Sequence, residues 1–282
     1  MKFKIVALPL MVCATSAAAE SYQSITNAQY TNNEFSTSDR SVDIDEFDLD
    51  TTYYFAPRET LGPLKEFDYI NKITKISAGY SYLDFPDDDA NAVGVGGEYF
   101  ATNGFVVGGG IVNIDETNLY NASVGYLFSP NFLLSVERTQ WEDNDADYLF
   151  NARYNHQLSD SGYIGFDFST DDDLESRTLS SKLFKDLGGE TWITASASFT
   201  SHDDFDDYWK LGTEYYFSRE TSVFADYDRG ENFGVGVSHF FNRNISGKLA
   251  YNTGSDTAGI VSYNAGSGVD TDTFLLGLTV QL

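Results

Sequence analysis

The chain has 282 residues, a formal net charge of −26, 24 glycines and an aromatic content of 16%. The excess of negative charge argues against nucleic-acid binding, because the phosphate backbone would be repelled. A helical membrane protein is excluded as well, since a spanning helix needs about 20 apolar residues and no such run follows residue 12.

The first residues have the pattern of a secretory signal peptide. Lys2 and Lys4 precede an apolar run, and small residues follow up to Ala19. We expect cleavage after Ala19, so that residues 1–19 are the signal peptide and residues 20–282 form the exported domain. The only cysteine, Cys13, falls within the signal peptide, which leaves the exported domain without a disulfide in a compartment that permits them.

The exported domain opens with three predicted strands. The first, Ser21–Tyr30, is weakly patterned, and a polar loop over Thr31–Val42 follows it. The second alternates an apolar face with an acidic one, and the third runs from about Lys75 to Tyr82. A period of two is typical of a strand whose two faces meet different surroundings. Between them, Pro57–Asn71 is the longest connection on its side, yet it gives no clear sign of folding inward as a constriction.

Hairpins then follow one another along the chain. The first contains an Asn-Gly turn signal and many glycines, and a polar or glycine-containing turn separates the later strands. The predicted hairpins cover Ala92–Ile114, Glu116–Phe128 with Asn131–Trp141, Tyr148–Leu158 with Tyr163–Ser169, and Arg177–Lys185 with Thr191–Thr200. Three strands within Tyr208–Phe241, a strand over Ile245–Asn252, a Gly/Ser-rich loop near Gly254–Val269 and a last strand over Phe274–Leu282 complete the chain.

This order predicts an all-β, transmembrane antiparallel β-barrel of about 16 strands, with 14 as the alternative. Short periplasmic turns would lie at one end and longer, acidic extracellular loops at the other. A soluble β-sandwich or β-solenoid is disfavoured because the faces opposite the apolar ones carry Lys, Arg, Asp and Glu in mid-strand. Such residues cannot all line a dry core, whereas they can line a water-filled lumen.

One stretch of the chain resembles a known family. An aromatic strand ending at Phe55-Ala56-Pro57, the turn Gly62-Pro63-Leu64 and a second aromatic strand over Ile76–Tyr82 follow each other. This arrangement resembles the general porin family of gamma-proteobacterial outer membranes. The resemblance implies a β-barrel that forms a diffusion channel in the outer membrane of a Gram-negative bacterium, without catalytic residues, and it suggests a homotrimer.

Alternation along the strands predicts which charged residues line the pore. The predicted pore-lining carboxylates are Glu46, Asp48, Asp50, Glu98, Glu137, Asp167, Glu214 and Asp226, and the basic residues are Lys75, Arg153, Lys182, Lys210 and Lys248. In a barrel of 16 strands the second strand lies across from the tenth. The acidic stripe of the second strand would then oppose Lys182 and create a transverse field that screens solutes by charge. The alternative is that these residues only keep the wall hydrated.

The sequence predicts no catalytic residue, metal site or cofactor. The three histidines lack the serine that an outer-membrane phospholipase needs two residues away, and His202 with Asp203 is the only pair that could suit a barrel protease. Acidic clusters are prominent, at Asp87–Asp89, Glu142–Asp147, Asp171–Glu175 and Asp203–Asp207. Carboxylate oxygens suit divalent cations, but none of the clusters has the spacing of a calcium loop, and a solvated, self-repelling loop surface is the favoured interpretation.

We therefore expect an outer-membrane porin, a passive diffusion channel for small hydrophilic solutes and ions that moderately favours cations. The alternative is a non-conducting surface barrel whose acidic loops bind divalent cations, lipopolysaccharide or other cells. Membrane lipid and lipopolysaccharide are the expected surroundings in either case.

Overall fold

The computed structural model describes residues 21–37, 40–86, 88–159, 162–203, 205–254 and 270–282. The predicted signal peptide, the acidic residues Asp87 and Asp204, and all of the predicted Gly/Ser-rich loop except Gly254 lie outside these residues. Within them, no helix is long and apolar enough to cross a membrane.

The described residues form strands joined by short connections. The first eight strands are β1 (Ser21–Ser36), β2 (Ser41–Glu59), β3 (Lys75–Asp84), β4 (Asp89–Phe100), β5 (Phe105–Ile114), β6 (Thr117–Ser129), β7 (Phe132–Trp141) and β8 (Ala146–Ser159). The next eight are β9 (Gly162–Asp171), β10 (Ser176–Gly188), β11 (Thr191–His202), β12 (Tyr208–Tyr216), β13 (Thr221–Asp228), β14 (Phe233–Phe240), β15 (Ile245–Gly254) and β16 (Asp270–Gln281).

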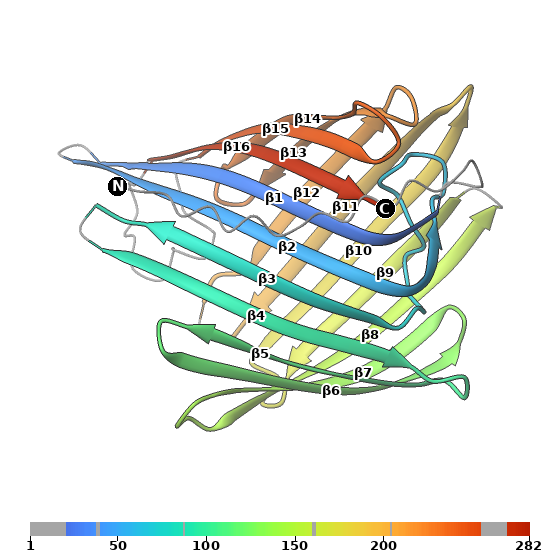
Figure 1. The fold of residues 1–282 in the computed structure, drawn as a ribbon, viewed down its shortest axis with the longest axis horizontal. Helices are drawn as coiled ribbons and strands as arrows, with labels where there is room; N and C mark the ends of the chain where they lie inside the picture. Colours follow the sequence, from blue (N-terminus) through green and yellow to red (C-terminus); the bar gives the residue numbers. More distant parts are fainter. Residues whose placement is uncertain (1–20, 38–39, 87, 160–161, 204, 255–269) are drawn as a thin grey trace.

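These strands make one closed antiparallel barrel in which each strand pairs with its neighbours in the sequence (Figure 1). The barrel closes where β1 pairs with β16, from Ile25 opposite Gln281 to Ser36 opposite Asp270. The predicted barrel of 16 strands is confirmed, and the glycine-rich pair β4 and β5 belongs to the wall. The alternative of 14 strands is wrong.

Several strands are longer than predicted. The stretch predicted as a loop, Thr31–Val42, instead continues β1 to Ser36 and opens β2 at Ser41. The outer face is polar in this region and the apolar pair Phe35 and Val42 lies on the inner face, so the usual contrast between the two faces is lost although the backbone pairing continues. Residues that extend beyond the apolar band meet water on both sides and need no apolar face.

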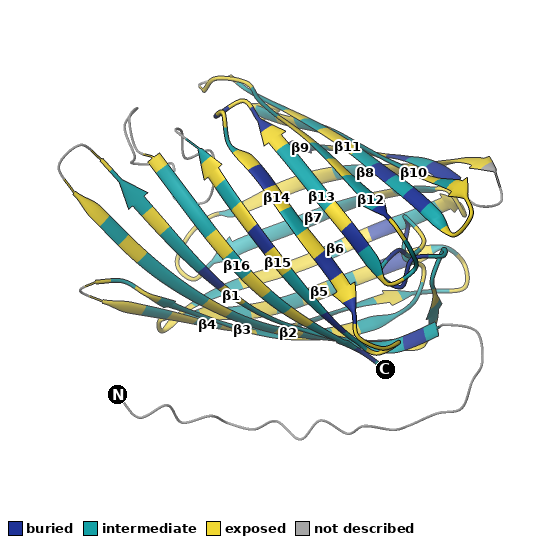
Figure 2. Ribbon diagram, turned by 90° about the horizontal axis from the view of Figure 1, so that it is seen from above, coloured by how far each residue is buried: buried dark blue, intermediate teal, exposed yellow. Residues whose placement is uncertain are grey.

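Exposed residues alternate with less exposed ones along most strands (Figure 2), and nearly all of the exposed large apolar residues of the strands lie on the outer face of the barrel, where they form a band. Around the end where β1 begins and β16 ends, called the terminal end below, aromatic rings contact one another within and between strands. Phe105 contacts Tyr126, Tyr126 contacts Phe128, and Phe132 contacts Tyr154, with ring centroids 4.9–6.5 Å apart. Apolar bands flanked by aromatic girdles are typical of barrels in lipid.

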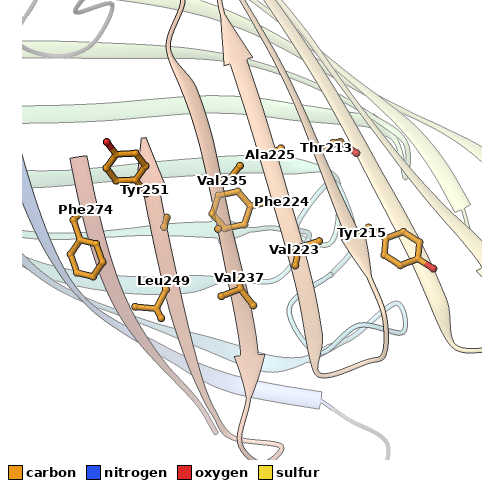
Figure 3. Close-up of a pocket in the computed structure, with 12 residues that line it drawn as sticks. Thr213, Tyr215, Val223, Phe224, Ala225, Val235, Val237, Leu249, Tyr251 and Phe274 are labelled. Carbon is orange, nitrogen blue, oxygen red and sulfur yellow. The ribbon is translucent and has the colours of Figure 1, made fainter. Parts of the chain in front are cut away.

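A shallow hollow interrupts this band on β12 to β16 (Figure 3). Small and branched side chains of the outer face, such as Thr213 and Ala225, form its floor, and Tyr215, Tyr251 and Phe274 are among the larger side chains that line it. The hollow therefore belongs to the lipid-facing surface and not to the interior.

The connections differ from the expected asymmetry in length. At the opposite end, where β1 ends and β16 begins, called the far end below, the described loops are almost as short as the turns; Asp115 and Glu116 alone join β5 to β6. The described parts of the predicted acidic clusters all lie at this far end. The longest described connection, residues 60–74, lies at the terminal end between β2 and β3, and it determines the shape of the interior.

Candidate functional site: a chain segment that bridges the barrel interior

Residues 60–74, called the inner segment below, fold into the barrel at the terminal end (Figure 1). A small hairpin starts the segment: Thr60 pairs with Phe67, and the Leu61 amide donates to the Glu66 carbonyl at 2.8 Å. Gly62 has a φ of 135°, and a side chain there would meet the indole of Trp192 at 2.7 Å. Glycine is therefore required both by the backbone conformation and by the close approach to β11.

The carboxylate of Glu66 attaches the inner segment to β10 and β12. It accepts hydrogen bonds from the Lys182 ammonium at 2.8 and 3.1 Å and from the Tyr216 hydroxyl at 2.6 Å. The Glu66 side chain is only 8% exposed. A buried carboxylate is stable only when paired and hydrogen-bonded, so these contacts fix its position.

The next residue, Phe67, contacts the other side of the barrel. Its ring lies edge-on to Tyr22 of β1 at 6.4 Å, and the Arg58 guanidinium of β2 lies 4.2 Å from its centroid. In the closed strand order, β2 and β10 are separated by the same number of strands in both directions. The inner segment thus bridges opposite walls of the barrel.

Two more residues of the segment bind the wall. The Lys65 ammonium forms an ion pair with Glu214 of β12. The Tyr69 hydroxyl donates to the Asp167 carboxylate of β9, which also accepts from the Arg153 guanidinium of β8 at 2.5 Å. Burial, together with the hydrogen bond to Asp167, raises the pKa of Tyr69 well above its ordinary value of 10.0, so the hydroxyl remains a donor at neutral pH.

An aromatic cluster supports the segment from the wall. Phe184, Tyr163, Trp192 and Tyr216 are almost completely buried, and Tyr69 of the segment packs against them. The rings of Tyr163 and Phe184 are stacked with centroids 5.7 Å apart. Leu61 of the segment packs against the cluster as well, so the segment covers one side of this apolar core.

The strand pairing places all of the predicted pore-lining residues on one face of the sheet. Residues directly opposite each other in an antiparallel pair share a face, and the register links Lys75 to Glu98 and Arg153 to Asp167. The same pairing connects the positions of Glu46, Asp48, Asp50, Glu137, Lys182, Lys210, Glu214, Asp226 and Lys248. This is the face that the inner segment contacts, called the inner face below.

Four of the five predicted basic residues are held in ion pairs with carboxylates. The nitrogen to oxygen distances are 3.7 Å for Lys75 with Glu98, 2.5 Å for Arg153 with Asp167, 2.8 Å for Lys182 with Glu66 and 2.8 Å for Lys210 with Asp226. Lys248 instead lies over the Phe224 ring, 5.0 Å from its centroid.

The acidic stripe on β2 has no such compensation. Asp48 accepts from the Ser81 hydroxyl at 2.5 Å, and Asp50 accepts from the Asn27 amide at 3.1 Å. No ion pair to Glu46, Asp48, Asp50 or Glu137 occurs among the described residues. The predicted transverse field between this stripe and Lys182 is weakened at the lysine, because Glu66 of the inner segment neutralises the Lys182 charge.

Sequence reasoning missed the inner segment. The predicted connection Pro57–Asn71 gave no clear sign of folding inward, yet most of it lies in the inner segment, and the residues that attach the segment, Lys65, Glu66 and Tyr69, were not among the predicted site residues. One signal was present: Leu64 and Ile70 are apolar residues in a turn at the membrane surface. Both are only 2% exposed, which is the burial that such residues require.

No group of three or more His, Cys, Asp and Glu side chains is arranged to hold a metal ion within the part of the chain that the structure describes. Charged pairs, hydroxyls and water-accessible carboxylates are what the inner face offers. They can attract, orient or repel a solute.

Comparison with solved structures places the fold among outer-membrane proteins. The outer membrane protein Omp33 of Acinetobacter baumannii shares 15% identity, covering 94% of this chain and 100% of that one, with a TM-score of 0.53. OccK7 (OpdD) of Pseudomonas aeruginosa shares 10% identity, covering 93% of this chain and 99% of that one, with a TM-score of 0.54. At these identities the likeness concerns the fold alone. No curated protein matches the chain significantly.

A family model decides the relationship. The model described as "Putative general bacterial porin" matches residues 1–270, which is nearly the whole chain. The resemblance in the region of the Gly-Pro-Leu turn is thereby confirmed. The protein is an outer-membrane β-barrel of a Gram-negative bacterium, and it belongs to this family of general bacterial porins.

Proposed function

We propose that the protein is a passive diffusion channel for small hydrophilic solutes and ions, with a moderate preference for cations. The terminal end is the periplasmic end in this proposal, because bacterial barrels keep both termini and the short turns there. Solutes would enter between the acidic loops of the far end and leave past the inner segment.

The observation that supports the cation preference is the imbalance of charge on the inner face. Four basic residues are already bound to carboxylates, whereas Glu46, Asp48, Asp50 and Glu137 make no ion pair among the described residues. An uncompensated carboxylate raises the local concentration of cations, and a low-dielectric wall focuses its field. The acidic loops add to this effect at the mouth.

The inner segment supports a size limit. Because Glu66 and Phe67 contact opposite walls, the chain occupies part of the cross-section at the terminal end. A solute must pass beside this bridge, which favours small molecules. The bridge is held by buried, charge-assisted contacts, so we treat it as a fixed constriction.

The test is the reversal potential of the purified, refolded protein in a planar bilayer under a potassium chloride gradient. Discrete conductance steps with a potential of cation-selective sign are expected. The double variant Asp48→Asn with Asp50→Asn should move the potential toward zero. Asp43→Asn is the matched control, because Asp43 lies on the outer face of the same strand near its far end, one residue out of phase with the stripe.

Two outcomes would contradict the proposal. A potential of anion-selective sign at low salt would overturn the cation preference. Absence of conductance steps from a protein that shows intact heat-modifiable folding would overturn the channel and favour the non-conducting surface barrel.

A further inference from the structure

Lys248 of β15 differs from the other predicted basic residues of the inner face. Within the described part of the chain, its ammonium makes neither an ion pair nor a hydrogen bond. It nevertheless has a defined position, with the nitrogen 5.0 Å from the centroid of the Phe224 ring. A cation over an aromatic ring is held by the electrostatic attraction of the ring face, and this contact leaves its hydrogen-bond donors available.

A glycine on the neighbouring strand leaves room for that ring. Phe224 of β13 lies opposite Gly236 of β14, and a side chain at Gly236 would meet the Phe224 ring at 2.2 Å. Any residue other than glycine at this position would therefore displace the ring. On the other neighbouring strand, β16, Gly277 lies beside the stem of Lys248. A Cβ atom at position 277 would lie only 3.3 Å from the Cβ atom of Lys248.

Four charged groups act electrostatically on Lys248. The charges of Lys65 and Lys210 both act on it, as do those of Glu214 and Asp226. These two carboxylates are already engaged, because Glu214 pairs with Lys65 and Asp226 pairs with Lys210 at 2.8 Å. Three positive charges thus face two negative ones, and the uncompensated charge is that of Lys248.

We propose that Lys248 and the Phe224 ring form a binding site for the carboxylate group of small organic solutes inside the lumen. The ammonium would donate charge-assisted hydrogen bonds to the carboxylate, and the half-buried Phe224 ring would contact the apolar part of the solute. The lysines at positions 65 and 210 stay paired with their own carboxylates, so Lys248 supplies the uncompensated positive charge. Attraction to Lys248 would offset the electrostatic repulsion between an anionic solute and the carboxylates elsewhere in the lumen. The inference rests on the proposed diffusion function, because the solute must reach the lumen.

The experiment measures interruptions of the single-channel current by benzoate in a planar bilayer. Benzamide, which has the same shape without the charge, is the control solute. Benzoate should produce resolvable interruptions in the unmodified protein, and benzamide should not. In Lys248→Gln the benzoate interruptions should become roughly tenfold shorter, the loss that accompanies removal of one hydrogen bond to a charged group. Lys248→Arg should restore most of their duration.

Lys185→Gln is the matched control variant. It removes the same charge, but Lys185 lies on β10 out of phase with Lys182, on the outer face, so its benzoate interruptions should equal those of the unmodified protein. A channel that conducts ions normally but responds to benzoate equally with and without Lys248 would overturn the site and leave the diffusion function intact. Interruptions by benzamide as long as those by benzoate would also overturn it. Absence of any conductance would instead contradict the diffusion function.

Discussion

Glu66 and Phe67 are consecutive residues whose side chains contact opposite walls of the barrel, Glu66 at Lys182 of β10 and Phe67 at Tyr22 of β1. The backbone between Glu66 and Phe67 is therefore held from both walls, and a short segment is enough to cross the interior of the barrel. The contacts on the β10 side are polar and buried, and those on the β1 side are aromatic. Each side can therefore be weakened separately.

Replacing Glu66 by Ala should release the inner segment from β10 and β12. Lys182 and Tyr216 would lose their shared acceptor, and an unsatisfied buried group costs about 1–3 kcal/mol. We expect a larger mean single-channel conductance with more current noise. Asp68→Ala is the control, since Asp68 in the same segment is 67% exposed and only weakly paired at 3.9 Å. Equal conductance in both variants and the unmodified protein would argue against a constriction held by Glu66.

A second prediction concerns the space beneath Tyr69. A side chain at Gly165 of β9 would lie 2.2 Å from the Tyr69 ring, so Gly165→Ala should displace the ring and break its hydrogen bond to Asp167. The expected result is an altered conductance. The same substitution in a Tyr69→Ala background should have little additional effect, because the two changes act on one contact. Additive changes in conductance would show that Gly165 acts through something other than Tyr69.

A third prediction tests the two faces of the wall. Leu211→Arg places a charge on the outer face, where Leu211 is 51% exposed, at a cost of about 2–4 kcal/mol in mid-membrane. We expect poor assembly, measured as the fraction of heat-modifiable folded protein. Ser196→Arg introduces the same residue on the adjacent strand. Its neighbour Ala197 pairs with Leu211 and shares the outer face, so Ser196 lies on the inner face. This variant should assemble normally, and equal damage from both would contradict the assignment of faces.

A fourth prediction concerns ionic strength. The cation preference should decline steadily as potassium chloride is raised at a constant gradient ratio, because fixed charges are screened within about 10 Å at 0.1 M and about 3 Å at 1 M. Reversal potentials at a series of concentrations measure this directly. A preference that stays constant up to 1 M would indicate selection by direct ion coordination and not by the field of the carboxylates.

The wall of the barrel could be predicted from the sequence because lipid imposes a simple rule. Along β12 and β16, apolar residues recur at every second position, and a charge such as Glu214 or Lys210 can only lie on the opposite face. Parity then assigns a face to each residue without knowledge of its neighbours. The strand ends were less predictable, because outside the apolar band the rule no longer applies.

The interior could not be predicted in the same way. Glu66 and Lys182 are separated by 116 positions, and their pairing depends on the path of a turn that has no periodicity. Gly165 is a comparable case. Only glycine fits there because the ring of Tyr69, 96 positions earlier, occupies the space of a side chain. The sequence of β9 alone would indicate only that a glycine weakens the strand. Side-chain contacts of this kind depend on the closed barrel, which brings the partners together after the strands have paired.

The closing of the barrel between β1 and β16 has a consequence for the order of folding. Ser24 and Leu282 exchange backbone hydrogen bonds of 2.8 Å, so the first and last strands become neighbours although nearly the whole chain separates them. Contacts of such long range are slow to form, because the entropy of a very large loop must be lost before they are made. Until then β1 and β16 are two open edges, which are prone to pair with other chains. The growing sheet therefore needs protection until its last strand arrives, and its completion is a single late event.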